Sequence, residues 1–600
     1  MSLHSYCIKY KMAATRCMGC LVLRHVPVFK SHGRLAVSRG VHQANVVYPF
    51  MLGKRWFSSK GWILPEGYDT GITIYNSAVR EKVPLKTLQP GLLTWYSCGP
   101  TVYDSAHIGH ALAYVKFDII RRILTKMFDL NVVMLLGVTD IDDKIIRRAQ
   151  DLGVDFRGIT KYYEEEFFTD MDKLRVMRPT VAPRVTEHIP HIISFIQKVI
   201  EKKLAYSVSD GSVYFDTVAY GKYGKMVPLP KVTDLPKTSL KKNARDFALW
   251  KGVKPGEPFW DSPWGHGRPG WHIECSAMAS HILGSQIDLH SGGIDLLFPH
   301  HENEEAQCCA YHTCDQWCNY WIHAGHLHTK GAEKMSKSLY NTISVSELLE
   351  QHSVNSFRLF CLLSHYRNKV DYTPTSMAQA NAHLRRIRAF LQDAYAYING
   401  QLKCGPLDEV GLKKKLAETR SKVKKSLADD MDTVRAFDAV LELIALGNKE
   451  LQTKPQSMSI ARSAGTMVSI CSYIHYLMED VFSITFPSVH DAASLSLESG
   501  GRLASVMNSV VSLRHQVRSY ALLQDENSTK EMLTSAEKKL RRQERAPLLN
   551  YCDEFRSNLQ KIGLHIKDHA GTSSWSVAEG ASGTDKFKKA KDEESATVKS

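Results

Sequence analysis

A run of strand, helix and strand between residues 92 and 139 constrains the fold of this chain more than any other feature. Residues 92–98 (LLTWYSC) form a short apolar run that predicts a buried strand. After a turn that contains Gly and Pro, a helix is expected over about 107–128, and a second apolar strand over 131–139. Strands that alternate with helices form parallel sheets, so the sequence predicts an α/β fold here.

The rest of the chain divides into an α/β part and a helical part. Helices are expected at about 160–175 and 188–203, and strands return at 287–290 and 320–326. Between these pairs, residues 205–262 contain several Pro and Lys and are interpreted as an irregular insertion. A chain of 600 residues is long enough for several domains.

Long amphipathic patterns with few Gly or Pro run from about Ser344 to residue 562 and predict an all-helical second half. The last 25 or so residues are rich in Lys, Glu, Ser, Gly and Ala, which is typical of a disordered tail. No apolar run is long enough to cross a bilayer as a helix.

The first 65 residues differ from the rest in charge. They contain ten Lys or Arg and no acidic residue, so they account for two thirds of the net charge of +15. This composition is typical of an organelle transit peptide, and the sequence RWFSS at 55–59 resembles a mitochondrial cleavage context. A disordered basic arm that binds RNA would have the same composition and is the alternative.

The chain has thirteen cysteines, three of them within the first twenty residues. The other ten do not have the spacing of a disulfide framework, and a chain of this length does not need one. We therefore expect a reducing compartment, with some cysteines as metal ligands and most as buried hydrophobic residues.

The first chemical motif is CGPTVYDSAHIGH (98–110), where the first predicted strand ends and a helix begins. Ligands of open parallel sheets bind at this edge, and the free N–H groups of a helix start favour phosphate. His107 and His110 add hydrogen-bond donors, and Gly109 lets a nucleotide approach the backbone. Surface histidines at a helix start would give the same short pattern, so the motif alone is weak.

The second motif is EKMSKS (333–338), between a strand and a helix. Lys334 and Lys337 place two ammonium groups three residues apart beside two serine hydroxyls, which makes a compact anion trap. Such a loop can clamp a leaving pyrophosphate. A solvated Lys/Ser loop is the common alternative.

A third group of residues is rich in metal-binding side chains. The segments GWHIEC (270–275) and FPHHENE (298–304) bring Cys, His and Glu together. The first His and the last Glu of FPHHENE are four residues apart and share one helix face. The candidate zinc ligands are two sulfurs, one nitrogen and one oxygen, from Cys98, Cys275, His300 and Glu304.

Two other sets of possible ligands are less favoured. His301 and Glu302 are interpreted as the polar start of a helix. His312, Cys314 and Cys318 form a rival cluster, which we interpret as core or surface residues because no second pair of cysteines completes it.

Taken together, these motifs resemble those of the cysteinyl-tRNA synthetases, a family of class I aminoacyl-tRNA synthetases. The resemblance runs from about Tyr96 to Trp575 and includes TDIDDK (139–144), PWG (263–265) and HSGGIDL (290–296). With CGPTVYDSAHIGH, GWHIEC and FPHHENE these make six ordered motifs, which are far more specific together than any one of them. The resemblance implies a Rossmann-type catalytic domain with an insertion, followed by a helical anticodon-binding region. The implied divisions are a mitochondrial transit peptide and arm (1–65), the catalytic domain (66–343), a helical region that contacts the tRNA stem and anticodon (344–575) and a disordered tail (576–600).

The resemblance also implies a role for each candidate residue. One zinc ion, held by the four ligands named above, would bind the thiolate of the substrate cysteine and reject serine, whose hydroxyl is a poorer ligand. Lys334 and Lys337 would act with the two histidines of the first motif in catalysis. The implied contacts are Gly99, Thr139 and Trp271 for cysteine, and His107, Gly109, His110 and Lys337 for ATP.

The implied reaction takes place in the mitochondrial matrix and joins L-cysteine to tRNA(Cys), with ATP and Mg²⁺. The cysteine carboxylate attacks the α-phosphorus of ATP, and a ribose hydroxyl of the tRNA then attacks the cysteinyl-adenylate; positioning and charge stabilisation supply the catalysis. The alternative is a cysteine ligase that acts on an amino-sugar, which has the same catalytic motifs but lacks the helical half. A zinc-stabilised RNA-binding protein without activity is disfavoured because the phosphate motifs are intact.

Some family members also make cysteine persulfide with pyridoxal phosphate on lysines near Lys144 and in the EKMSKS loop. Arg147 stands here where such members have a second lysine, which disfavours this added activity. Tyr340, Gly137 and Ser291 also differ from frequent family residues, but none of them is a candidate metal ligand.

Clusters of basic residues in the helical half predict a track for the tRNA backbone. Solvated helix faces would explain any one cluster equally well. The three clusters are Arg385, Arg386 and Arg388; Lys422, Lys424 and Lys425; and Lys538 to Arg545.

Overall fold

The computed structural model describes most of the chain between residues 61 and 577. The described ranges are 61–229, 239–328, 342–402, 404–453, 464–486, 500–522, 535–569 and 572–577. The expected transit peptide, the EKMSKS motif and the expected tail therefore lie almost wholly outside the described residues.

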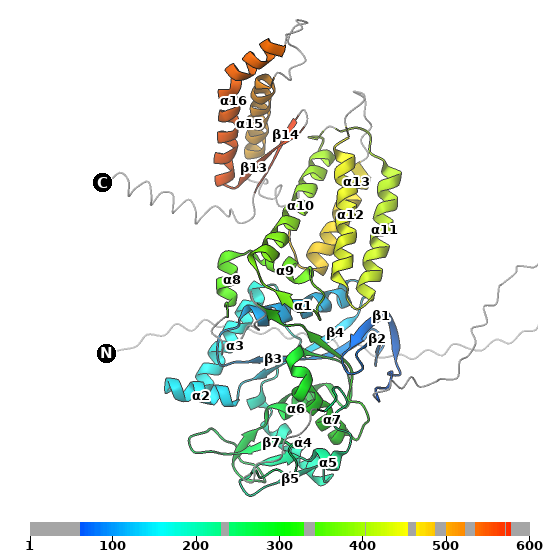
Figure 1. Cartoon of the computed structure of the whole chain (residues 1–600), viewed down its shortest axis with the longest axis vertical. Coiled ribbons are helices and arrows are strands. Elements are labelled where there is room, and N and C mark those ends of the chain that lie inside the picture. Colours follow the sequence, from blue (N-terminus) through cyan, green and yellow to red (C-terminus); the bar gives the residue numbers. More distant parts are fainter. Residues whose placement is uncertain are drawn as a thin grey trace, which may run out of the picture. The chain divides into compact units, whose positions relative to one another are not determined.

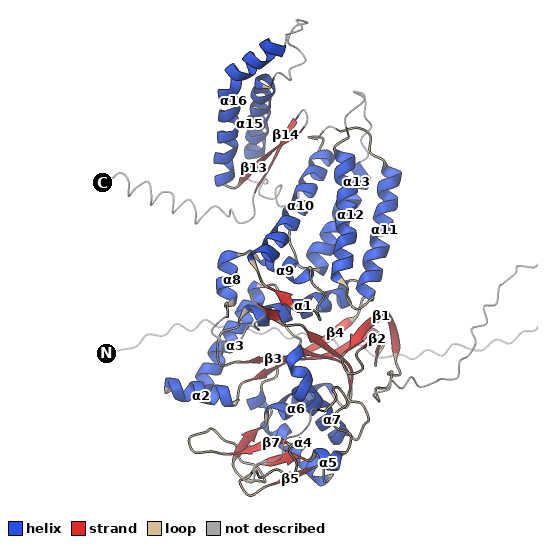
Figure 2. Ribbon diagram, viewed as in Figure 1, coloured by secondary structure: helices blue, strands red, loops and turns tan. Residues whose placement is uncertain are grey.

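A four-stranded parallel sheet organises the N-terminal half (Figures 1 and 2). Its strands run in the order β10-β9-β3-β4, and every neighbouring pair is parallel. The strand order reverses between β9 and β3, which is where ligands of such sheets bind. The predicted α/β fold is confirmed. The strands are β3 (Leu92–Thr101), β4 (Asn131–Thr139), β9 (Ile287–Gly293) and β10 (Cys318–Ala324).

Helices connect these strands, and local sequence signals fix their ends. Asp142 caps the helix after β4 by accepting a hydrogen bond from the N–H of Lys144 at 2.8 Å, and Gly153 ends that helix in a left-handed conformation. The helices are α1 (Ile108–Lys126), α2 (Asp143–Leu152), α3 (Phe156–Lys173), the short 3₁₀ turn η1 (Val185–Glu187), α4 (Ile189–Glu201), α6 (Trp271–Leu283) and α7 (Glu302–His312).

The segment interpreted as an irregular insertion contains a small antiparallel sheet in the order β5-β6-β7-β8. Three of its strands have only three residues, too few for an alternating pattern to stand out in the sequence. The elements are β5 (Ala205–Ser207), β6 (Val213–Phe215), α5 (Thr217–Tyr220), β7 (Phe247–Gly252) and β8 (Gly267–Pro269).

Helices dominate the second half, as predicted. Three further pairs of strands lie outside the two larger sheets. An antiparallel hairpin, β1–β2, precedes the central sheet; β11 pairs in parallel with β12; and the antiparallel hairpin β13–β14 follows the last helix. None of these pairs was predicted. The strands are β1 (Tyr68–Asn76), β2 (Glu81–Thr87), β11 (Leu327–His328), β12 (Val370–Asp371), β13 (Leu564–His569) and β14 (Thr572–Val577). The helices are α8 (Val345–Gln351), α9 (Val354–Leu362), α10 (Pro374–Ile398), α11 (Glu409–Ala428), α12 (Thr433–Leu451), α13 (Ala464–His475), the π-helical turn η5 (Tyr476–Val481), α15 (Gly500–Ala521) and α16 (Ser535–Lys561).

One buried ion pair joins α1 of the N-terminal half to α9 of the helical half. Arg358 donates to Asp118 at 2.5 Å, and both side chains are fully buried. The same guanidinium donates to the carbonyls of Leu174 and Phe482, each at 2.9 Å. These partners satisfy a charge that would otherwise be costly to bury.

None of the described helices combines the length and apolar character that crossing a membrane requires.

Candidate active site and metal centre

The first candidate ligand lies at the carboxyl end of β3, at the point where the strand order reverses. Cys98 is nearly buried, and its carbonyl accepts a hydrogen bond from the hydroxyl of Tyr114 at 3.3 Å. A Cβ at Gly99 would collide with the carbonyl oxygen of Gly137 on β4. Glycine is therefore required here for the loop to leave the sheet next to β4.

The other three candidate ligands come from the two helices that flank β9. Cys275 lies in the first turns of α6, Glu304 lies in α7, and His300 lies in the π-helical turn η3 (Leu297–His301) that precedes α7. His300 Nε2 is 3.0 Å from Glu304 Oε1 and 3.6 Å from Cys275 Sγ. Cys98 Sγ is 3.8 Å from the same glutamate oxygen. The four ligand atoms all lie within 4.8 Å of one another.

The protonation of this group is tightly coupled. Burial raises the pKa of the Cys98 thiol well above its usual value, whereas a hydrogen bond from that thiol lowers the pKa of Cys275 to about 6. Burial alone would raise the pKa of Glu304, but the charges of His290 and His300 lower it to about 2. Burial alone would lower the pKa of His300, but Glu304 raises it to about 10. A thiolate and a carboxylate thus face each other in a dry site, which is the donor chemistry that zinc requires.

A set of aromatic side chains surrounds these four residues. His290 Nε2 lies 2.9 Å from Glu304 Oε2, and His272 Nδ1 lies 2.8 Å from His300 Nδ1. The indole of Trp271 stacks on the His300 ring with 4.4 Å between centroids and is 39% exposed, so it lines the site. The sequence assigned no role to His272 or His290, although both lie in the quoted motifs.

A second, overlapping group of possible ligands shares two residues with the first. Cys98, His290, His301 and Glu304 also have ligand atoms within 4.8 Å of one another. His301 Nε2 lies 3.4 Å from Cys98 Sγ, and its Nδ1 lies 2.8 Å from Nε2 of His323. Burial and the neighbouring histidines hold the pKa of His301 well below its usual value, so this imidazole is neutral. His323, on β10, has no signal in the sequence that would have identified it.

The histidine motif forms the start of α1. His107 is the N-cap residue, and its Nδ1 accepts a hydrogen bond from the N–H of Gly109 at 3.1 Å. Its ring stacks on that of His110 with 3.8 Å between centroids. The structure therefore brings the phosphate-binding residue types of the motif to a helix start beside β3.

The segment that follows the EKMSKS motif is attached to this helix start. Ile108 N–H donates to the carbonyl of Ile343 at 2.9 Å, and Val345 N–H donates to the carbonyl of Ala106 at 3.2 Å. Lys334 and Lys337 themselves lie outside the described residues. Ile343 is only six residues after Lys337, so the described chain resumes at the helix start soon after the motif.

Comparisons with known proteins identify the family. The family model of the class I (C) tRNA synthetase catalytic domain matches residues 84–382. A relative from Xenopus tropicalis, named probable mitochondrial cysteine–tRNA ligase, is 48% identical over 86% of this chain and 91% of its own length. A cysteine–tRNA ligase from Pyrococcus abyssi is 39% identical over 84% of this chain and 98% of its own length. The chain belongs to the cysteine–tRNA ligase family of class I aminoacyl-tRNA synthetases.

A solved structure of a family outside the cysteine–tRNA ligases has the same fold. It is methionyl-tRNA synthetase from Mycobacterium tuberculosis, solved with methionyl-adenylate. The match covers 65% of this chain and 92% of the methionyl-tRNA synthetase chain, with a TM-score of 0.51. Identity is 15%, so this likeness concerns the fold alone.

Two residues at which this chain differs from frequent cysteine–tRNA ligase sequences have local explanations. A Cβ at Gly137 would collide with the hydroxyl of Tyr96, so the buried tyrosine requires glycine there. Ser291 accepts a hydrogen bond from the indole N–H of Trp95 at 2.8 Å and donates to Ser97 at 2.9 Å. Neither residue is a candidate metal ligand.

The predicted amino-acid contacts lie at the ends of β3 and β4 and at the start of α6. Thr139 ends β4, and its hydroxyl donates to Glu274 Oε2 at 3.2 Å. Burial raises the pKa of Glu274 well above its usual value. Gly99 and Trp271 complete the predicted set in the positions described above. The sequence did not single out Glu274, although it lies inside the GWHIEC motif.

The rival cluster does not form a metal site among the described residues. His312 Nε2 lies 3.0 Å from the hydroxyl of Ser280, and Cys318 Sγ donates to the carbonyl of Tyr320 at 3.2 Å. The metal-binding groups found within the described ranges include neither residue nor Cys314. The interpretation of these residues as core or surface residues stays a prediction.

Glu302 has a structural role. Its carboxylate accepts hydrogen bonds from the backbone N–H groups of Gly224, Lys225 and Met226 at 2.8, 3.0 and 2.7 Å. These contacts anchor the insertion to the start of α7. Glu302 also belongs to neither of the two metal-binding groups, as its interpretation as a polar helix-start residue requires.

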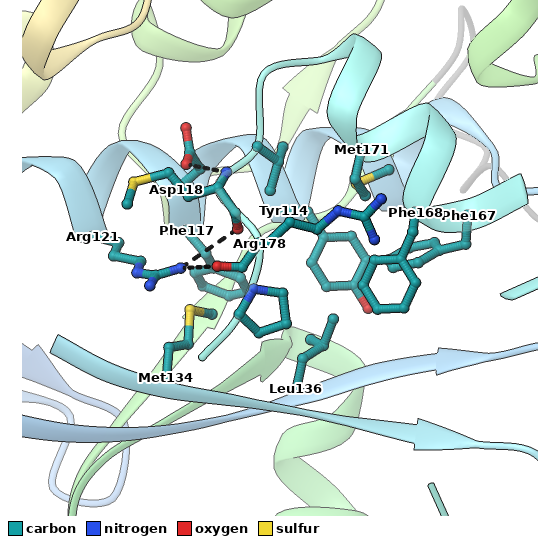
Figure 3. A pocket seen from close by; sticks show the side chains of 13 residues that line it. Tyr114, Phe117, Asp118, Arg121, Met134, Leu136, Phe167, Phe168, Met171 and Arg178 are labelled. Atoms are coloured by element: carbon teal, nitrogen blue, oxygen red, sulfur yellow. Dashed lines mark hydrogen bonds between the residues drawn. The ribbon is translucent and has the colours of Figure 1, made fainter. Parts of the chain in front are cut away.

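A small apolar cavity lies between α1, α3 and β4 (Figure 3). Tyr114, Phe167 and Met171 line it, and Arg121 at its edge donates to the carbonyl of Arg178 at 2.7 Å. Its volume of about 30 Å³ has room for no more than a few water molecules. None of the predicted site residues lines it, although the hydroxyl of Tyr114 donates to the carbonyl of Cys98.

Proposed function

We propose that this chain ligates L-cysteine to tRNA(Cys) in mitochondria through a cysteinyl-adenylate, with a zinc ion held by Cys98, Cys275, His300 and Glu304. The observation that carries the proposal is the meeting of these four ligand atoms within 4.8 Å at the carboxyl end of β3, beside the helix start that carries the histidine motif. Zinc bound there would accept the substrate thiolate as a further ligand, which a serine hydroxyl replaces poorly.

The first set of ligands is preferred over the overlapping one for two reasons. It contains two sulfurs, one of them the Cys275 thiol whose pKa is lowered to about 6, and thiolate is the donor that zinc favours. In the overlapping set, His290 already holds the outer oxygen of Glu304 and His301 is paired with His323. Such contacts are typical of residues that orient ligands.

The chain's own residues supply binding and charge in the two steps. The helix start at His107 and His110 is positioned for the ATP phosphates, with Mg²⁺ as the usual companion of ATP. Lys334 and Lys337 would clamp the leaving pyrophosphate, and Gly99, Thr139 and Trp271 would contact the amino acid. The cysteine carboxylate attacks the α-phosphorus, and the terminal ribose hydroxyl of the tRNA then attacks the activated carbonyl, so no protein nucleophile is required.

Three observations support the choice of tRNA and compartment. The Xenopus tropicalis relative is named mitochondrial, and the first 65 residues of this chain have transit-peptide composition. The relatives extend over the helical half, which an amino-sugar ligase would lack. We propose the mitochondrial matrix as the location. The added persulfide activity with pyridoxal phosphate stays a prediction.

The deciding experiment measures ATP–pyrophosphate exchange with cysteine and serine side by side, then charging of tRNA(Cys). Cysteine alone should support exchange, and Cys275→Ser should weaken cysteine binding sharply because a thiolate ligand is lost. Three outcomes would contradict the proposal. They are pyrophosphate exchange with serine, the absence of zinc from the purified protein, and transfer of cysteine to an amino-sugar in place of tRNA.

A further inference from the structure

Two cysteines occupy the C-terminal cap of α7, away from the candidate metal ligands. Thr313 follows the helix in a left-handed conformation (φ 58°, ψ 46°), and its N–H donates to the carbonyl of Cys309. The N–H of Cys314 donates to that same carbonyl at 3.2 Å. This is the six-to-one hydrogen bond of a Schellman-type cap, which brings the side chains of its first and last residues into contact. In this chain both of those residues are cysteines.

The cap hydrogen bond brings the two cysteines close together, and they differ in exposure. Cys309 is buried, whereas Cys314 is only half-buried. The neighbouring Cys309 side chain lowers the pKa of Cys314, which favours the Cys314 thiolate. The exposed member of the pair is therefore the one with more nucleophilic character.

A lysine stands beside the buried member of the pair. Lys225 Nζ donates to Cys309 Sγ at 3.5 Å and to the carbonyl of Asp315 at 2.5 Å. It also pairs with Glu305 Oε1 at 3.4 Å, and that oxygen accepts from the Cys309 thiol at 3.3 Å. The ammonium group thus joins the insertion to the cap and supplies a positive charge near both sulfurs.

The neighbouring cysteines lack these properties. Burial raises the pKa of Cys308 and of Cys318 well above the usual value, and the two thiols donate to the carbonyls of Ser276 and Tyr320. Metal binding does not explain the pair either, because the metal-binding groups among the described residues exclude it.

We propose that Cys309 and Cys314 are a dithiol modification site that hydrogen peroxide converts to a disulfide, which thiol reductants reverse. The Cys314 thiolate attacks the peroxide oxygen, the O–O bond breaks, and Cys314 becomes a sulfenic acid while hydroxide leaves and takes a proton to become water. The Cys309 sulfur then attacks the Cys314 sulfur and loses its proton, the S–O bond breaks, and a second water leaves. Two thiols are oxidised and one peroxide is reduced to two waters.

This site has a physical consequence for its helix. The disulfide closes a ring across a cap that the backbone already forms, so little rearrangement is required. Cys309 acts as the resolving residue, because its attack on the Cys314 sulfenic acid prevents further oxidation of Cys314 to the sulfinic acid. Because α7 also carries Glu304, such a trap would protect a helix of the candidate metal centre from irreversible oxidation.

The test uses the full-length, zinc-loaded protein with hydrogen peroxide as the probe. Peptide mapping without reductant should show Cys309 linked to Cys314, with a loss of two hydrogen atoms in mass and full reversal by dithiothreitol. Cys314→Ser should abolish the link. Cys309→Ser should leave a Cys314 sulfenic acid that dimedone traps, and Cys308→Ser should form the link as the unmodified protein does.

A further comparison tests the lysine. Lys225→Met should slow the reaction several-fold, and Lys225→Arg should retain most of the rate because it keeps the charge. The proposal is overturned if the unmodified protein shows Cys314 oxidised to the sulfinic acid without a disulfide. The proposal is also overturned if the peroxide instead links the Cys309 sulfur to the Lys225 nitrogen through an oxygen atom. Both readouts need only the unmodified protein, and neither depends on aminoacylation.

Discussion

His290 Nε2 lies 2.9 Å from Glu304 Oε2, while the other oxygen of that carboxylate faces His300 and Cys98. The glutamate therefore offers one oxygen to the candidate metal and is held in place by its other oxygen. Both side chains are fully buried, so water does not replace the histidine. Outer contacts of this kind fix the orientation of a ligand and tune its affinity for metal.

We expect His290→Ala to weaken zinc binding by about 10–100-fold, because the carboxylate of Glu304 loses the contact that orients it. Competition with a chelator, followed by metal analysis, measures this change. His312→Asn is the matched control, since His312 contacts Ser280 outside the site and should leave zinc affinity unchanged. Equal affinity in both variants would remove His290 from the support of the metal centre.

The four candidate zinc ligands could be named from the sequence because each lies in a motif of ordered residues. The supporting residues could not be assigned in the same way. His290 on β9 and His323 on β10 contact Glu304 and His301, which lie in α7 and in the turn before it, between the two strands in the chain. Such a contact depends on strand order, which a single sequence does not state.

Several long elements were predictable, although the nine-residue strand β1 was not. The predicted strand at 131–139 matches β4, and the predicted helix at 107–128 contains α1. The strands of the insertion were missed because strands of three residues leave no measurable period. The β13–β14 hairpin follows a long helical pattern, and its strands are too polar to stand out from it.

Lys337→Ala should slow adenylate formation by removing a cation that stabilises the leaving pyrophosphate, while cysteine affinity changes little. Pyrophosphate exchange measures the rate, and its dependence on cysteine concentration measures the affinity. Lys161→Ala, on the exposed face of α3, serves as a control and should behave as the unmodified protein does. An unchanged exchange rate in Lys337→Ala would exclude this lysine from the mechanism.

Lys116 predicts a pH dependence of stability. It is 3% exposed and donates to the carbonyl of His365 at 3.1 Å, and burial lowers its pKa from 10.5 to about 8. Below about pH 8 both folded and unfolded chains carry the proton, so the cost of burying the charge, roughly 3 kcal/mol, is present in full. Above that pH the folded chain releases the proton first, and the cost shrinks until about pH 10.5.

The thermal midpoint of Lys116→Met should therefore exceed that of the unmodified protein most below about pH 8, and the difference should narrow as the pH rises towards about 10.5. The sign follows from a depressed lysine pKa, since the unfolded chain binds more protons throughout that window. Thermal melts at a series of pH values test this. A difference that stays constant with pH would show that Lys116 does not titrate in this range.

The Arg358–Asp118 pair predicts a large loss of stability. Arg358→Met leaves the Asp118 carboxylate buried without its main cation, and breaking such a pair costs about 3–5 kcal/mol. Asp118 keeps hydrogen bonds from Arg122 and from the N–H of Met177, both at 2.8 Å, so the lower end of that range is expected. Thermal melts should also show partial recovery in the double variant with Asp118→Asn. Lys413→Met, which breaks only an exposed pair with Glu409, should change stability by less than about 0.5 kcal/mol.

This buried pair also determines how tRNA recognition by the helical half should be tested. A chain shortened near Gln351 would lose Arg358, and its catalytic half could misfold. A loss of tRNA charging in such a chain would therefore not show that the helices bind tRNA. Substitution of exposed basic residues avoids this difficulty. Lys422 is a poor choice because it pairs with Glu442 at 3.0 Å, whereas Lys424, Lys425, Arg541 and Arg542 are exposed.

We expect the double variants Lys424→Glu/Lys425→Glu and Arg541→Glu/Arg542→Glu to raise the KM for tRNA(Cys) and to leave cysteine-dependent pyrophosphate exchange unchanged. Phosphate contacts release counterions, so each lost contact should reduce the slope of log affinity against log salt by about one. Lys161→Glu, on the catalytic half, is the matched charge control. If both double variants keep the full salt dependence and the same KM, these clusters are solvated helix faces. If pyrophosphate exchange falls together with tRNA charging, the substitutions have disturbed the catalytic half. Thermal melts of each variant distinguish this outcome from a loss of tRNA contacts.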